Sequence, residues 1–427
     1  MTLLPAGAAA GPSRASMNHP VFQSSSALPA PSARERAAIQ SDRAQTELRH
    51  GRPLVIVGAA PDAALLLVST VETLTAERLG WLLAAAAANG VEPRLLLTAE
   101  RLRALGCMQA STARAMRVAT PWTLERLQQL AAVSPGAADG SLLDDPQAAG
   151  APMEAAIGLA KRARLIPALL TLELPGAVLP ALQAARVLAW YEADAAAAPA
   201  VDLPRLLRVS DAQVPIAVHE DCQLVLFREI DGDVEHVAIL VGTPRPDQPV
   251  PVRLHSSCLT GDLLGSLRCD CGDQLRRAID HLAEVGGVLL YLSQEGRGTG
   301  LANKLRAYRL QDGGLDTIEA DRHLGFRGDE RDFGIAVAML RALGIERITL
   351  LTNNPSKITA LRRGGIEVAG RLPLIAPVNR HNSRYLRTKR ERAGHLHPDD
   401  EQVKSPPGGA DLLVFTRGIL SGPGSAL

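Results

Sequence analysis

The chain has 427 residues, of which 46% are hydrophobic and 21% are charged. At roughly 150 residues per domain, this length predicts two or three domains, and the composition excludes a fibrous or wholly disordered protein. The 46 Lys and Arg residues balance 45 Asp and Glu residues, which gives a net charge near +1. Because no overall field attracts nucleic acid or a membrane surface, any site for an anion must be local.

Both ends of the chain have the composition of unfolded segments. Residues 1–45 are rich in Ala, Ser and Pro. They predict a disordered leader, and the scarcity of basic residues favours a plain tail, or a start at Met17, over a targeting signal. Residues 399–427 predict a flexible tail. Charged residues interrupt the apolar runs before the roughly 20 residues that a membrane span needs, so we expect a soluble protein.

The first folded unit is expected over residues 46–204. Its apolar runs predict strands at 53–58, 64–69 and 168–174. Thr75 is a suitable N-cap for a helix that ends before Gly90. One face of that helix carries Leu79, Leu82, Leu83 and Ala86. These patterns indicate an α/β domain.

The second unit is expected over residues 205–398, after a boundary in the Asp- and Pro-containing stretch 195–204. Two strands are predicted at 223–227 and 236–242, and strands and helices then alternate to about residue 395. The predicted fold class is therefore α/β (mixed α+β), with two domains.

Three of the five cysteines lie within one short segment, at Cys258, Cys269 and Cys271. This clustering favours thiolates that bind a metal in a reducing compartment such as the cytoplasm over a disulfide framework. Thiolates suit zinc, and three ligands without an obvious fourth favour a hydrolytic metal, with His255 as a candidate fourth ligand. Buried free thiols are the alternative. Cys107 and Cys222 stand apart and are expected to be core or surface thiols.

Seven motifs occur in a characteristic order: RLHSSCLTGD, SLRCDCGDQL, QEGRGTGL, RAYRLQD, LGFRGDERDF, LLTNNPSK and YLRTK. Over residues 206–395 they closely resemble the GTP cyclohydrolase II family. The resemblance implies zinc-dependent hydrolysis of GTP to 2,5-diamino-6-(5-phosphoribosylamino)pyrimidin-4-one, formate and pyrophosphate, the first step of riboflavin biosynthesis. It also implies one Zn²⁺ per subunit, Mg²⁺ with the triphosphate, and a homodimer.

The resemblance assigns catalytic roles to Tyr308, Asp329 and Arg331, and zinc to the three cysteines. Tyr308 would lie near the carbon that is attacked, although its helical spacing also fits a core stripe with Leu301 and Leu305. Asp329 matches a proton acceptor, and it could also cap a helix. Arg331 matches a proposed nucleophile on the α-phosphorus, whereas its high pKa makes electrostatic stabilisation of the departing phosphate the more conservative role.

The resemblance also implies a set of residues that hold GTP. They are Arg253, Leu254, His255, Ser256, Ser257, Gln274, Glu295, Gly296, Arg297, Thr317, Thr352 and Lys357. Local patterns agree, because QEGRGTGL follows an apolar strand and precedes a helix, a common anion-binding arrangement. Likewise Asn354 would cap a helix that begins at Pro355, just after a strand. Glu295 could accept hydrogen bonds from guanine and so select it over adenine.

Three positions near the site depart from the family pattern. Ser257 stands where an acidic residue is usual, Ser293 where a basic residue is usual, and Thr299 where a branched aliphatic residue is usual. These changes leave open a catalytically silent or altered GTP-binding regulator with a structural zinc, or a variant that stops at a formamide intermediate. The three cysteines with Tyr308, Asp329 and Arg331 favour the enzyme.

The first unit more faintly resembles 3,4-dihydroxy-2-butanone 4-phosphate synthase, in GRPLVIV, VETLTAERL and MEAAIGLAKRARLIPALLTLEL. That family needs an acidic cluster for magnesium and a histidine before a later helix. Here Asp62 is the one carboxylate in the first place, and Pro152 and Met153 occupy the second. Since a hard divalent cation needs several oxygen ligands, we expect this domain to keep the fold and to lack the activity. It would then serve as a scaffold, dimer partner or regulator.

Overall fold

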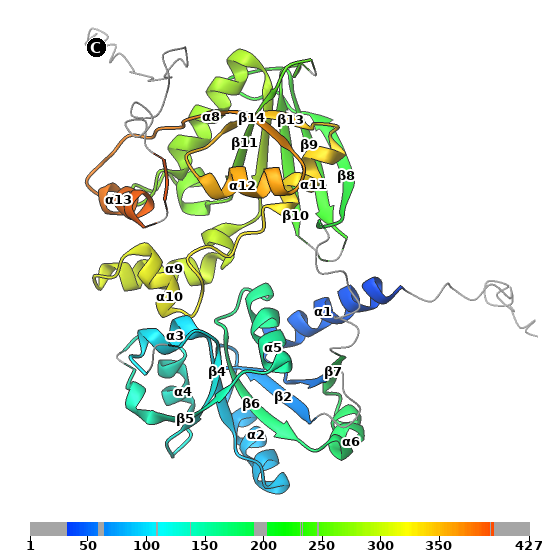
Figure 1. Ribbon diagram of the computed structural model, residues 1–427, viewed down its shortest axis with the longest axis vertical. Helices are drawn as coiled ribbons and strands as arrows, with labels where there is room; N and C mark the ends of the chain where they lie inside the picture. Colours follow the sequence, from blue (N-terminus) through cyan, green and yellow to red (C-terminus); the bar gives the residue numbers. More distant parts are fainter. Residues whose placement is uncertain are drawn as a thin grey trace, which may run out of the picture.

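The computed structural model describes residues 32–396 apart from 59–63, 108–109, 137, 192–202, 231, 233, 246 and 393. Each half of the chain is built on a seven-stranded sheet with helices packed around it (Figure 1). The predicted mixed class with two domains is confirmed. In the described part of the chain, no helix combines the length and the apolar character needed to cross a bilayer.

The first sheet has the strand order β5-β4-β3-β6-β2-β1-β7. Its strands are β1 (Leu54–Val57), β2 (Leu65–Thr70), β3 (Arg94–Leu97), β4 (Arg114–Val118), β5 (Leu143–Ala148), β6 (Ala168–Leu174) and β7 (Leu188–Tyr191). The helices of this domain are α1 (Ala33–Arg49), α2 (Ala76–Asn89), α3 (Ala99–Ala104), α4 (Leu124–Leu130), α5 (Ala151–Arg162) and α6 (Leu179–Ala184), with 3₁₀ turns at Gly140–Leu142 and Gly176–Val178.

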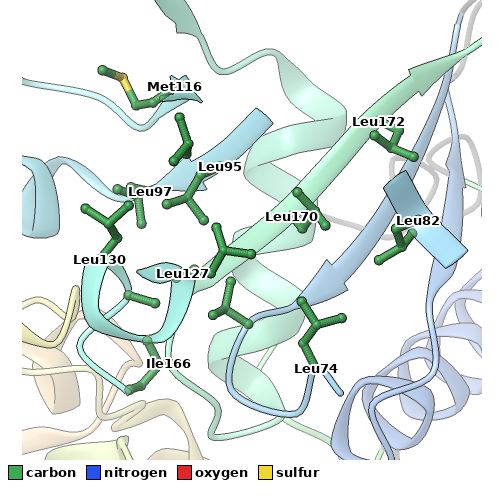
Figure 2. Packing of buried hydrophobic residues seen from close by; sticks show 14 of the residues in the cluster. Leu74, Leu82, Leu95, Leu97, Met116, Leu127, Leu130, Ile166, Leu170 and Leu172 are labelled. Atoms are coloured by element: carbon green, nitrogen blue, oxygen red, sulfur yellow. The ribbon is translucent and has the colours of Figure 1, made fainter. Parts of the chain in front are cut away.

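Both faces of the first sheet are buried, which explains why its central strands are continuously apolar. Along β2, Leu65 and Leu67 face one core, and Leu66 and Val68 face the other. The first core includes side chains of α2 and α4 (Figure 2). Helices α1 and α5 contribute to the second core. As predicted, Thr75 caps α2 and Gly90 ends it in a left-handed conformation.

The predicted leader of residues 1–45 is wrong for its last part, because residues 33–45 belong to helix α1. Ser32 and Glu35 form a capping box that starts this helix. The sequence of α1 is mostly polar, and its buried side chains are those of Ala44 and Leu48. It therefore lacks the apolar periodicity from which a helix is predicted. Residues 1–31 and the tail predicted at 399–427 lie outside the described residues.

The second sheet has the strand order β14-β13-β11-β12-β10-β9-β8. Its strands are β8 (Leu206–Gln213), β9 (Cys222–Glu229), β10 (Glu235–Val241), β11 (Val250–Ser256), β12 (Gly287–Leu292), β13 (Arg347–Leu351) and β14 (Glu367–Leu372). The helices are α8 (Cys271–Val285), α9 (Leu301–Asp312), α10 (Thr317–His323), α11 (Gly334–Ala342), α12 (Pro355–Arg363) and α13 (Ser383–Glu391), with a π-helical turn at Leu259–Leu263 and a 3₁₀ turn at Glu295–Gly298.

The two domains share one hydrophobic core. Helix α10 of the second domain lies against α3 of the first (Figure 1). The side chains of Ala320, Leu324 and Phe326 are at most 2% exposed and belong to the same cluster as the leucines of β3 and β6. Burial of this apolar surface joins the domains.

Buried hydrogen bonds complete this junction. Arg101 on α3 is 2% exposed and donates to the carbonyl oxygens of Leu130 (2.8 Å), Gln129 (3.0 Å) and His323 (2.8 Å). It thereby satisfies the C-terminal end of α4 and ties it to α10. The Thr98 hydroxyl donates to the carbonyl of Gly325 at 2.8 Å.

We predict that Arg101→Met lowers the free energy of unfolding by about 2 to 4 kcal/mol, because three buried carbonyls lose their donor. The matched control is Arg117→Met, which breaks an exposed ion pair with Asp144 in the same domain and should cost at most about 0.5 kcal/mol. Urea unfolding followed by circular dichroism measures both. Equal effects of the two variants would contradict the role of Arg101.

Candidate active site at the ends of three parallel strands

The candidate site lies where three neighbouring strands of the second sheet end. Strand β11 pairs in parallel with both β12 and β13. Their carboxyl ends therefore meet at one edge of the sheet, the usual position of a ligand site in such sheets. A cavity of about 330 Å³ opens there. Its lining comes from the segments that follow the strands, 256–258, 294–297 and 352–357, and from α8, α9, α10 and α13.

The cavity gathers nearly all the residues that the sequence predicted for the site. The lining includes Arg253, His255, Ser256, Ser257, Cys258, Cys269, Cys271, Gln274, Glu295, Gly296, Arg297, Tyr308, Thr317, Asp329, Arg331, Thr352 and Lys357. Leu254 is the exception. It is fully buried in the core beneath the sheet, and its backbone carbonyl accepts a hydrogen bond from Lys357 Nζ at 2.8 Å.

The three thiols of Cys258, Cys269 and Cys271 meet at one end of the cavity, within 4.8 Å of one another. Cys258 follows β11, and Cys271 begins α8. The π-helical turn between them places Gly261 directly against the sulfurs. A Cβ at Gly261 would lie 2.9 Å from Cys269 Sγ and 3.0 Å from Cys258 Sγ, so a larger residue does not fit.

This geometry fits a zinc ion. The sulfurs of Cys258 and Cys269 are 3.7 Å apart. A tetrahedral zinc with Zn–S bonds of about 2.3 Å would separate its sulfurs by about 3.8 Å. Among the described residues, this is the one group of three or more His, Cys, Asp or Glu side chains close enough to share a metal. The neighbouring thiols and Lys304 lower the pKa of Cys258, which favours a thiolate there.

His255 is oriented by a carboxylate and is not grouped with the thiols. Its Nε2 lies 3.0 Å from both carboxylate oxygens of Asp262. The same carboxylate accepts hydrogen bonds from the Tyr291 hydroxyl and the Cys258 backbone N–H, both at 2.9 Å. Burial lowers the pKa of His255, so its ring is neutral at physiological pH. Asp262 is thus a positioning residue that sequence reasoning missed.

Lys304 on α9 is a second residue that sequence reasoning missed. Its Nζ donates to Cys258 Sγ at 3.0 Å and to Glu295 Oε1 at 2.8 Å. Although burial opposes the charge, these two hydrogen bonds raise the pKa of Lys304. A signal was present in the sequence, because Lys304 precedes Tyr308 by four residues and so shares its helix face.

Tyr308 faces the cavity and not the core. The core-stripe interpretation is wrong, because Leu305 is 51% exposed and the buried side chains of α9 are Asn303 and Ala307. The Tyr308 hydroxyl lies 3.4 Å from Thr260 Oγ1. The guanidinium of Arg268 sits over the ring, 5.1 Å from its centroid.

Asp329 and Arg331 also line the cavity, and they form a close ion pair with each other. Asp329 Oδ1 accepts from Arg331 Nε at 2.8 Å, and burial of the carboxyl is outweighed by this arginine, which lowers the pKa of Asp329. The prediction that Asp329 caps a helix is wrong, since α11 begins at Gly334 after Phe333. Near the start of this helix, the Gly334 N–H donates to Asp332 Oδ1 at 2.7 Å.

The segment that carries Asp329 and Arg331 is packed against the 3₁₀ turn Glu295–Gly298. The backbone N–H of Glu330 donates to the Arg297 carbonyl at 3.0 Å. Gly298 has a φ of +91°, and a Cβ there would lie 2.9 Å from the Glu330 carbonyl oxygen. A glycine is therefore required for the two segments to approach each other.

Buried positive charge lines the cavity. Lys357 and Arg253 are 5% exposed, and burial lowers the pKa of Arg253 to about 10. Burial and the neighbouring Arg253 and Arg331 also lower the pKa of Lys357 well below its usual range. Asn354 caps α12 and Pro355 begins it, as predicted, which places Lys357 in the first turn. Buried cations that repel one another are stabilised by an anion.

Helix α13 contributes Tyr385 and Lys389 to the lining of the cavity. Lys389 Nζ donates to Asp270 Oδ1 at 2.6 Å, and Asp270 in turn accepts from Gln274. The hydrogen bond from Arg253 to Gln274 Oε1, at 2.7 Å, extends this chain into the cavity. The sequence singled out YLRTK as a motif and assigned it no role.

Comparison with known proteins agrees with this geometry. Residues 207–373 match the family model of GTP cyclohydrolase II. A protein of Azospirillum brasilense named GTP cyclohydrolase-2 is 42% identical over 378 residues, which cover 85% of this chain and 95% of that protein. The chain belongs to the GTP cyclohydrolase II family of enzymes. A GTP cyclohydrolase-2 of Xylella fastidiosa (strain Temecula1 / ATCC 700964) is also 42% identical, over 84% of this chain and 87% of its own length.

Other proteins named GTP cyclohydrolase-2 match a shorter part of this chain. The GTP cyclohydrolase-2 of Azotobacter vinelandii is 56% identical over 41% of this chain and 85% of its own length. Among solved structures, RibBX, a two-domain 3,4-dihydroxy-2-butanone 4-phosphate synthase from A. baumannii, matches 79% of this chain and 99% of its own with 17% identity and a TM-score of 0.30.

We predict that Gly298→Ala destabilises the protein more than Gly344→Ala does. Both glycines have a positive φ, so each alanine costs about 1 to 2 kcal/mol of left-handed strain. Gly344 has open space around it, whereas an alanine at Gly298 meets the Glu330 backbone and adds about 1 to 3 kcal/mol. Chemical denaturation measures the difference, and equal losses would show that the approach of the two segments is not tight.

Proposed function

We propose that this protein hydrolyses GTP to 2,5-diamino-6-(5-phosphoribosylamino)pyrimidin-4-one, formate and pyrophosphate, as the first step of riboflavin biosynthesis. The observation that carries the proposal is the shared cavity: a trio of thiols suited to zinc lies at one end, and buried cations suited to a triphosphate lie beside it. A purine nucleotide with a charged tail matches both groups, with its base near the thiols and its phosphates near the cations.

Cys258, Cys269 and Cys271 would hold the zinc ion. When bound, zinc lowers the pKa of a coordinated water toward about 7 and so supplies a nucleophile at neutral pH. Lys304 donates to the Cys258 sulfur and balances part of the negative charge of the thiolates. With three protein ligands, this site has the composition of a catalytic centre and not that of a closed structural one.

The triphosphate would bind beside the buried cations of the cavity, with Mg²⁺. Arg253, Arg297 and Lys357 line this space, and an anion there would offset the unfavourable burial of the Arg253 and Lys357 charges. Asp321, which also lines the cavity, pairs with Arg297, with 3.3 Å between Nη1 and Oδ2.

The base would lie between Glu295 and Tyr308. Glu295 already accepts hydrogen bonds from Lys304, the Gly296 N–H and the Leu259 N–H, which leaves one lone pair on Oε2 for a donor of guanine. The Tyr308 phenol can donate to the ring as it opens, because its hydroxyl faces the thiol end of the cavity and burial raises its pKa.

Asp329 and Arg331 would act at the phosphate end. Asp329 stays ionised beside Arg331 and can accept a proton. Arg331 holds a fixed positive charge next to Ser256, with 3.4 Å between Nη1 and Oγ, where it would stabilise the departing phosphate. This electrostatic role needs no deprotonated guanidinium and is the one that we propose.

The first domain is proposed to lack synthase activity. Pro152 and Met153 occupy the first turn of α5, where the resemblance requires a histidine, and the Met153 side chain is buried. Asp62, the carboxylate of the expected magnesium loop, lies outside the described residues. The relatives from Azospirillum and Xylella, whose similarity extends through this domain, are named for the cyclohydrolase alone.

We predict that Cys269→Ser loses the bound zinc and lowers the rate of formate release from GTP by at least about 100-fold, since a serine hydroxyl is a poor zinc ligand at neutral pH. Cys107→Ser, a thiol in the first domain, is the matched control and should keep both. Metal analysis and a formate assay measure the outcome. Zinc and turnover equal to the wild type in Cys269→Ser would contradict the metal site.

We predict that Tyr308→Phe lowers kcat by about 10- to 100-fold and leaves the zinc content unchanged, because the ring remains and the proton donor is lost. Formate and pyrophosphate are quantified separately. Their release in equal amounts by the wild type supports the complete reaction. Pyrophosphate without formate would indicate a reaction that stops at a formamide, and neither product would indicate a silent GTP-binding protein.

A further inference from the structure

Two residues at the end of α5, Lys161 and Arg164, connect the first domain to the two catalytic segments of the second domain. Among the described residues, the first domain contributes none to the cavity lining. The end of α5 nevertheless contacts two segments of the second domain. One of them flanks the 3₁₀ turn Glu295–Gly298, with contacts before and after the turn, and the other carries Asp329 and Arg331. These contacts are polar.

Lys161 reaches the segment with the Asp329–Arg331 pair. Its Nζ lies 2.6 Å from Glu330 Oε1, and the two side chains are 18% and 16% exposed. The same Glu330 oxygen accepts from the Arg327 N–H at 2.8 Å. Lys161 therefore anchors the one residue that stands between Asp329 and Arg331 in the sequence. A partly buried ion pair of this kind fixes backbone position more firmly than an exposed pair does.

Arg164 forms hydrogen bonds with residues before and after the turn Glu295–Gly298. Its Nη2 donates to the Ser293 carbonyl at 3.1 Å, and its own carbonyl accepts from Asn303 Nδ2 at 3.0 Å. Its side chain also covers Gly300, where a Cβ would lie 3.2 Å from Arg164 Cβ. The residues that the proposed function assigns to GTP, Glu295 and Arg297, lie between these anchor points.

The backbone at Arg164 is in an unfavourable conformation that places this side chain. Its φ is +61°, at the position after the α5 C-cap that glycine usually occupies. Arg186 provides an internal comparison: it follows the C-cap of α6 with the same φ of +61° and the same backbone hydrogen bond to the residue three positions earlier. Both side chains are exposed, and that of Arg164 donates to the Ser293 carbonyl of the second domain. A strained residue whose side chain contacts a functional loop indicates a positional role.

We propose that the first domain positions the catalytic segments of the second: Lys161 sets the place of the Asp329–Arg331 segment, and Arg164 sets the place of the Glu295–Gly298 turn. The proposal rests on the proposed function, because it assigns the turn to GTP binding and the ion pair to chemistry. Lys161 and Arg164 are positioning residues, since they act through Glu330 and through the backbone around the turn.

The two contacts are expected to affect different kinetic constants. In Lys161→Met, Asp329 and Arg331 lose their anchor, and we expect kcat to fall by about 3- to 10-fold with KM within twofold of the wild type. Lys161→Arg keeps the charge and should restore kcat to within about twofold. In Arg164→Gly, the hydrogen bond to the Ser293 carbonyl before the Glu295–Gly298 turn is lost. We expect KM for GTP to rise by about 3- to 10-fold with kcat within twofold of the wild type.

Arg186→Gly is the matched control for Arg164→Gly. Both changes place glycine at a left-handed position, so relief of strain and the greater freedom of the unfolded chain affect both in the same way. We expect both unfolding temperatures to stay within about 2 °C of the wild type and KM to rise in Arg164→Gly alone. A loss of stability would not produce this split, because fewer folded molecules lower the apparent kcat and leave KM unchanged.

The measurements are made on the full chain with GTP, with formate release as the readout. If the wild type is active, an unchanged kcat in Lys161→Met or an unchanged KM in Arg164→Gly overturns the positioning role. Either result leaves the proposed function intact. Equal rises of KM in Arg164→Gly and Arg186→Gly also overturn it. A wild type that releases no formate contradicts the proposed function, and this inference falls with it.

Discussion

The parallel pairing of β11 with β12 and β13 is the constraint on which the site depends. It ends three strands at the same sheet edge, and each strand then delivers a different chemical group: a thiol after β11, a carboxylate and a guanidinium after β12, and an ammonium after β13. Residues separated by about a hundred positions in the chain thereby share one cavity. A shift of any of these strands by one residue would turn its side chains to the other face and separate the groups.

Burial of charge is the second constraint, and it links the cavity to its substrate. Arg253 and Lys357 lie deep in the fold with other cations near them, an arrangement that disfavours their charged forms. The protein offsets part of this cost with carbonyls of Leu351 and Leu254. Carbonyls satisfy hydrogen-bonding capacity without adding a full negative charge, so an anion bound beside Arg253 and Lys357 would further stabilise their charged forms.

The sequence predicted the features that depend on local chemistry. Thr75 and Gly90 were correctly placed at the ends of α2, and Asn354 and Pro355 at the start of α12, because caps act within one turn. The grouping of the three cysteines followed from their spacing. Tyr308 needed the family resemblance, since its helical spacing alone indicated a core position.

The sequence did not predict contacts between distant segments. Asp262 and Lys304 escaped notice because their roles depend on partners in other segments, such as Tyr291 for Asp262 and Cys258 for Lys304. Helix α1 escaped notice because few of its side chains are buried. The anchors at Lys161 and Arg164 join residues more than a hundred positions apart, and no periodicity or cap reports such a pairing.

The shared core between the domains has a consequence for how this chain can evolve. Ala320, Leu324 and Phe326 are covered by the first domain, so a chain without that domain would expose a continuous apolar surface to water. Such a surface promotes aggregation unless other substitutions make it polar. Removing the first domain in one step would therefore leave its neighbour with exposed apolar surface, which favours keeping the two domains in one chain.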